Sequence, residues 1–101
     1  MQNLEFNQTT IDSRQVAVML EKEHSELLKD IRKYTEYLRE GNFPFSEFFI
    51  ESSYKTKGNN KTYKNYQITK KGCEFLAHKL TGAKGATFTA KYINIFMVTK
   101  L

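Results

Sequence analysis

The sequence has a single cysteine, Cys73, among its 101 residues. A lone cysteine excludes an internal disulfide and a zinc site built from several cysteines. No apolar run approaches the roughly 20 residues that a membrane-spanning helix needs. The opening stretch, MQNLEFNQTTIDSR, has neither the basic start nor the apolar core of a secretory signal. Together these absences predict a cytoplasmic protein that does not enter a membrane.

The usual catalytic motifs are also missing. The sequence contains no Gly-rich phosphate loop, no G-x-S-x-G and no H-E-x-x-H. Cys73 and His78 share a predicted helix, but five residues of helix rotate their side chains about 140° apart, so they cannot hold one metal ion together. Cys73 instead falls on the apolar face of that helix and is expected to behave as a small buried residue. We therefore expect no enzymatic activity, no cofactor and no metal site.

What the sequence does contain is typical of one soluble globular domain. Its length suits a single domain, and its 40% hydrophobic and 27% charged residues allow one core without suggesting disorder. We expect residues 1–101 to form one domain, in which residues 1–10 are a tail or a short edge strand.

Two helices joined by a short polar turn are predicted first. Asp12 suits an N-cap, with Gln15 three residues later as in a capping box, and the helix that follows is about two turns long. A longer helix ends at Gly41, and Pro44 opposes its continuation. Its apolar stripe has helical spacing and comprises Leu27, Leu28, Ile31, Tyr34, Tyr37 and Leu38.

The pattern then changes to the alternation of a β-hairpin. The stretches FSEFFIESSYK and TYKNYQIT alternate, with Tyr66 and Ile68 as the expected inward pair, and the connector TKGNNK contains residues that tolerate positive φ. A third helix is predicted from its cap at Thr69 to Gly82, and a last helix over residues 86–99. The expected fold is α+β: a helix-turn-helix-like pair, a wing-like hairpin and two C-terminal helices on one core.

Positive charge gathers on two of these predicted elements. The net charge is +5, and cations lie on the outer face of the second helix and around the hairpin tip. A helix in the major groove beside a hairpin on phosphates is a known way to hold duplex DNA. The residues expected to contact double-stranded DNA are Ser25, Lys29, Arg32, Lys33, Lys55, Lys57, Lys61 and Lys64.

The same charges also fit a protein that binds no DNA. A solvated helix face needs charged residues in any protein, and lysines on a hairpin also prevent aggregation between strand edges. The alternative function is a protein-interaction module, such as an antirepressor or an inhibitor of a host factor. Its contact surface would use Tyr54, Tyr63 and an apolar patch of Ile95, Met97 and Val98.

Several stretches also resemble one protein family in the same order: DSRQVAVML, HSELLKDIRKY, FSEFFIESSYK, YQITKKGCEFLAHKLTG and TFTAKYINIF. Over residues 10–96 the chain resembles the N-terminal domain of the Rha family of phage regulatory proteins. The resemblance implies a phage or prophage transcriptional regulator or antirepressor-like factor acting in a bacterial host cell. It brings no catalytic residue and no cofactor, and it leads us to expect a further C-terminal domain in family members.

The last segment departs from the family pattern. Ile95, Met97 and Val98 stand where charged residues are expected around and after YIN-x-F. Apolar residues nearly all round a helix suggest burial against a partner. This departure raises the expectation of a homodimer formed through the last helix.

Overall fold

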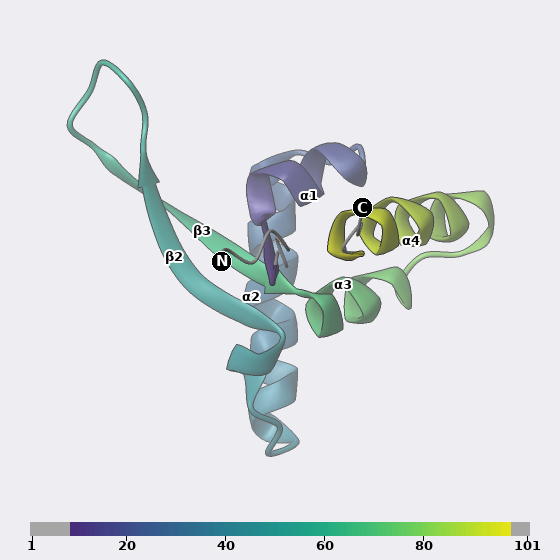
Figure 1. Cartoon of the computed structure of the whole chain (residues 1–101). Helices are drawn as coiled ribbons and strands as arrows, with labels where there is room; N and C mark the ends of the chain where they lie inside the picture. Colours follow the sequence, from purple (N-terminus) through teal and green to yellow (C-terminus); the bar gives the residue numbers. More distant parts are fainter. Residues whose placement is uncertain (1–8, 98–101) are drawn as a thin grey trace, which may run out of the picture.

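The computed structural model describes residues 9–97 and has an α+β fold, as the sequence predicts. In this part of the chain, a three-stranded antiparallel sheet of order β1-β3-β2 is accompanied by four α-helices and one 3-10 turn. The β2–β3 hairpin projects from the body, and α4 lies on the opposite side of the molecule from the hairpin tip (Figure 1). No helix in the described range is long and apolar enough to span a bilayer.

The first two helices match the prediction closely. Strand β1 (Thr10–Asp12) is an edge strand and leads directly into α1 (Ser13–Met19). Asp12 caps α1, because its Oδ1 accepts a hydrogen bond of 2.8 Å from the Arg14 amide. Helix α2 (His24–Glu40) follows a short turn and is capped at Gly41, as expected.

One residue of the predicted α2 stripe was misplaced. Tyr37 is 56% exposed, whereas Leu27, Ile31 and Leu38 are buried. Tyr37 lies close to the end of α2, just before the chain turns at Gly41. Leu38 is the next residue and lies at almost the same height, but one residue of helix turns its side chain about 100° away from Tyr37, so Tyr37 falls at the exposed edge of the stripe.

The hairpin agrees with the predicted alternation. The 3-10 turn η1 (Phe45–Glu47) precedes β2 (Phe49–Lys55), and β3 (Thr62–Thr69) pairs with β2 and β1. Ile68 is paired with Phe49 on one side and Ile11 on the other, and all three side chains are buried. Tyr66 is buried too, which confirms the expected inward pair.

The two C-terminal helices have other boundaries than the sequence predicted. Helix α3 (Lys70–Ala77) starts after the predicted cap, because Thr69 Oγ1 accepts a hydrogen bond of 3.0 Å from the Gly72 amide. It ends at Ala77 and not at Gly82, because bonds from Lys79 N to Leu76 O and from Leu80 N to Ala77 O tighten the chain.

Helix α4 (Gly82–Phe96) therefore begins earlier than residue 86. Gly82 adopts φ +63° at the start of α4, so the glycine begins one helix and does not end the other. The predicted end at residue 99 lies outside the described residues.

The apolar patch expected on the last helix is only partly present. Ile95 packs partly buried against the core, so it does not belong to an exposed patch. Met97 is 64% exposed, and Val98 lies outside the described residues. The core takes up Phe88 and Tyr92 from α4 and Cys73 and Leu76 from α3. Homodimerisation through α4 stays a prediction.

Candidate nucleic-acid interface

The predicted contact residues on α2 are all solvent-exposed. Ser25, Lys29 and Arg32 follow each other at spacings of four and three residues, so they form one stripe along the helix. Lys33 lies beside this stripe, and its Nζ is 5.5 Å from the ring centroid of Tyr34. The stripe is therefore free to meet a ligand along the N-terminal half of α2.

The remaining predicted residues lie on the hairpin arm, residues 53–64. Every residue from Lys55 to Lys64 is exposed. Lys57 and Lys61 belong to the connector, where Gly58 has φ +88° and the Asn59 side chain accepts a 2.7 Å bond from the Lys61 amide. Asn59 is thus engaged in building the turn. The arm therefore carries four exposed lysines on a backbone whose turn is held by hydrogen bonds.

Strand register fixes the face on which two of these lysines lie. Lys64 is paired with Ser53, and Lys55 is paired with Thr62. Side chains two residues apart on a strand share a face. Lys64 therefore shares a face with Tyr66, and Lys55 shares the face of Glu51 and Phe49.

Helix α2 covers this same face of the sheet. The Phe75 ring lies 6.0 Å from the Phe49 ring and 5.2 Å from the Tyr34 ring, so it links β2 to α2. Figure 1 shows α2 crossing behind β3. Burial raises the pKa of Tyr66, the Glu51 charge raises it further, and the Arg32 charge lowers it. Arg32 of α2 and Lys64 of the arm hence lie on the same side of the sheet.

The cations of this surface are unpaired within residues 9–97. The four salt bridges there join Arg14 to Asp12, Lys22 to Asp30, Arg39 to Glu36 and Lys71 to Glu47. None involves a predicted contact residue. Because none of them forms a salt bridge in this range, their charges remain available to phosphates or to another anionic partner.

The opposite face of the arm carries a stack that the sequence did not reveal. The Arg14 guanidinium lies 3.7 Å from the Tyr54 ring centroid, and the Tyr54 and Tyr63 rings are 5.6 Å apart as a cross-strand pair. Tyr54, expected as a protein contact, is half-buried here, and Tyr63 is 37% exposed. The alternation of the tyrosines was visible in the sequence, whereas their contact with Arg14 depends on tertiary packing. The stack braces the arm against α1.

A buried polar cluster joins β3, just beyond the arm, to the starts of both helices. Ser13 is fully buried, and its Oγ accepts a 3.0 Å bond from the Tyr66 amide and lies 2.9 Å from His24 Nε2. Asn65 is 2% exposed, and its Nδ2 donates to Asp12 Oδ2 at 2.9 Å. The cluster ties α1, α2 and β3 together. Sequence reasoning picked out Asp12 as a cap and Tyr66 as an inward residue, but neither Ser13 nor Asn65, and it did not predict the cluster.

The chemistry of Cys73 is that of a core residue. Burial raises the pKa of its thiol to about 12, so the thiol stays protonated near neutral pH. His78 is exposed on the surface at the end of α3. No group of three or more metal-ligating side chains occurs among the described residues.

Comparison with known proteins identifies related sequences. A family model described as phage regulatory protein Rha matches residues 11–99. The "SPbeta prophage-derived putative antirepressor protein YoqD" of Bacillus subtilis (strain 168) is 43% identical over 89 residues. That alignment covers 88% of this chain and 35% of YoqD, so the chain spans about a third of this relative's length. No solved structure matches the chain.

Proposed function

The chain belongs to the family of phage regulatory protein Rha, and from this premise we propose that it binds double-stranded DNA through α2 and the hairpin arm. The observation that carries this proposal is that Arg32 and Lys64 lie on the same side of the sheet. With both elements on one side, the helix could enter the major groove of duplex DNA while the hairpin contacts the neighbouring phosphates.

The roles of the contact residues follow from their chemistry. Lysines offer a point charge without directional demand, so Lys55, Lys57, Lys61 and Lys64 would bind phosphates and position the protein. Ser25 lies in the first turn of α2, and the N-terminal residues of a groove-bound helix are the ones that reach base edges. Sequence preference would therefore come from α2, and most of the affinity from the arm.

The bracing of the arm supports this division. An arm held by the Arg14–Tyr54–Tyr63 stack loses less conformational entropy on binding than a free loop does. The Ser13 cluster also fixes the start of α2 relative to β3. Both contacts hold the helix and the arm in a set spacing before DNA arrives.

In the wider setting, we infer a non-enzymatic regulator that acts in the cytoplasm of a bacterial host and needs no cofactor. A second function, binding to a repressor or host factor, is favoured by one observation: YoqD, which is 43% identical over 89 residues, is named as an antirepressor. The two functions predict different surfaces, because DNA would contact cations and a protein partner would contact apolar residues.

The test is a mobility-shift titration of duplex DNA across a salt series. We expect binding at low salt that weakens steeply as salt rises, because released counterions drive it. The double variant Lys57→Glu/Lys61→Glu should bind every duplex more weakly by a similar factor. Lys84→Glu/Lys91→Glu is the matched control, since it reverses two exposed lysines on α4, far from the arm (Figure 1). Absence of a shift at low salt, or equal loss in the control, would contradict DNA binding.

A further inference from the structure

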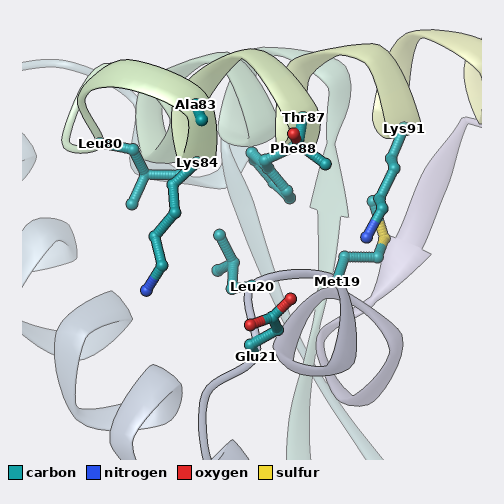
Figure 2. A pocket seen from close by; sticks show the side chains of 9 residues that line it. All are labelled: Met19, Leu20, Glu21, Leu80, Ala83, Lys84, Thr87, Phe88 and Lys91. Carbon is teal, nitrogen blue, oxygen red and sulfur yellow. The ribbon is translucent and has the colours of Figure 1, made fainter.

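A groove lies between the end of α1 and helix α4, on the opposite side of the molecule from the hairpin tip (Figure 1). Its volume is about 160 Å³, and its apolar lining comes from Met19, Leu20, Leu80 and Phe88. Figure 2 shows these side chains between the two helices, with Phe88 directed into the space. Phe88 is itself buried, so the groove ends on the hydrophobic core.

The size of the groove limits its occupant. Pockets for drug-sized ligands usually measure about 300–1,000 Å³. A cavity of roughly 150 Å³ can hold a molecule the size of benzene. The groove therefore suits a single apolar side chain inserted from a partner, in the way that a large anchor residue fills a pocket at a protein interface.

The charges around the groove define the partner further. Lys84 and Lys91 are two helical turns apart on α4 and reach down on either side of Phe88 (Figure 2). Both are exposed and have no salt-bridge partner in residues 9–97. Helix α4 has no acidic residue to offset them. Glu21 on the facing rim is the one carboxylate in the lining.

We propose that this groove docks a helical segment of a partner protein that carries one large apolar anchor flanked by carboxylates. The anchor enters between Leu20, Leu80 and Phe88, and the flanking carboxylates pair with Lys84 and Lys91. The groove and the hairpin tip lie on opposite sides of the molecule, so the partner leaves the hairpin arm uncovered (Figure 1). The inference does not require DNA binding, and either can fail without the other.

A display library of random helical peptides provides the probe. The immobilised 101-residue chain is used for selection, and the enriched peptides are then measured by fluorescence anisotropy at low and moderate salt. We expect enriched peptides to share a Leu, Phe or Met with Asp or Glu three or four residues away. On one helix face this spacing presents anchor and charge together.

Substitutions in the groove test whether the selected peptides bind there. Lys84→Glu/Lys91→Glu should weaken the selected peptides about tenfold or more, because two attractive pairs become repulsive. Thr87→Trp, at an exposed position in the lining, should block the groove without reversing any charge. Lys29→Glu/Lys33→Glu on α2 is the matched control. It should leave peptide binding unchanged while it weakens duplex binding.

Four outcomes overturn the proposal outright, and two more assign the groove to another occupant. The first two concern the selection: no peptide is enriched, or the enriched peptides lack carboxylates. The other two concern the variants: Lys84→Glu/Lys91→Glu binds the selected peptides as tightly as the wild type, or the α2 control Lys29→Glu/Lys33→Glu loses peptide binding. A dimer of the chain in sedimentation that Lys84→Glu/Lys91→Glu dissociates would assign the groove to a second copy instead. Loss of duplex binding with Thr87→Trp would assign it to DNA.

Discussion

Ser13 Oγ lies 2.9 Å from His24 Nε2 and thereby joins the first residue of α1 to the first residue of α2. The same oxygen accepts a bond from the Tyr66 amide, and the hydroxyl keeps its proton and a second lone pair for the contact with the imidazole. One buried hydroxyl thus positions two helices and the central strand.

This arrangement makes stability depend on pH near neutrality. Burial lowers the pKa of His24 from its ordinary value of 6.5; Asp12 opposes this shift and Arg14 adds to it. The folded state binds fewer protons than the unfolded chain, so stability is present above about pH 6.5 and falls as pH drops below it. We expect urea unfolding at a series of pH values to show this loss.

The matched control for His24 is the other histidine. In His24→Gln the pH dependence between about pH 7 and 5 should largely disappear. His78→Gln removes an exposed imidazole and should leave the pH dependence of stability as it is in the wild type. Equal pH dependence in wild type and His24→Gln would contradict the role assigned to His24.

Asp12 should contribute more to stability than an ordinary surface carboxylate. Its bond from the Arg14 side chain, together with bonds from the Arg14 amide and Asn65, lowers the pKa of Asp12 to about 2, although burial opposes this. Asp12→Ala removes the cap of α1 and should cost about 1–2 kcal/mol in chemical unfolding at neutral pH.

The Asp12 contribution has its own pH window. A lowered carboxyl pKa gives stability that is present above about pH 3.8 and is lost as pH falls through about 2. Asp30→Ala, which breaks the exposed pair with Lys22, is the control and should cost less than about 1 kcal/mol. A similar cost for the two variants would count against the assignment.

Two glycines should respond in opposite ways to alanine. A Cβ on Gly72 would lie 2.2 Å from Phe48 O and 2.8 Å from Ile68 Cγ2, so Gly72→Ala must displace α3 from the strands. We expect a loss of about 3 kcal/mol or more in the free energy of unfolding. At Gly85, within α4, the nearest atom to a Cβ is 3.5 Å away. Gly85→Ala should be neutral or stabilise by up to about 1 kcal/mol.

The salt dependence of duplex binding should report single phosphate contacts. In Lys57→Ala the slope of log affinity against log salt should become shallower by about 1. Lys84→Ala on α4 should leave the slope unchanged. If Lys57→Ala still bound duplex DNA with an unchanged slope, the arm tip would not be part of the DNA interface.

Cys73 should be inert towards thiol reagents in the folded protein. Its thiol is fully buried, and its pKa of about 12 against an ordinary 9.0 leaves about a thousandfold less thiolate at neutral pH. A chromogenic disulfide reagent should react with the chain in denaturant and barely react without it. Rapid reaction of the native protein would show that α3 opens readily.

The local elements were predictable because their signals lie within short segments. The capping carboxylate of Asp12, the stripe through Leu27 and Ile31, and the alternation around Tyr66 each depend on residues that are close in sequence. The same local reasoning failed at Gly82, because a glycine at a helix boundary fits the end of one helix or the start of the next.

What the sequence determined by itself was an α+β chain of the Rha family, its capped helices, its hairpin and its basic residues. The tertiary structure alone decided that Arg32 and Lys64 share a side, that Arg14 covers Tyr54 and that Asp12 meets Asn65. It also decided that α1 and α4 leave a lysine-rimmed groove. The physical reason is that periodicity fixes which face of an element is apolar, whereas the neighbour of each polar side chain depends on how distant segments pack.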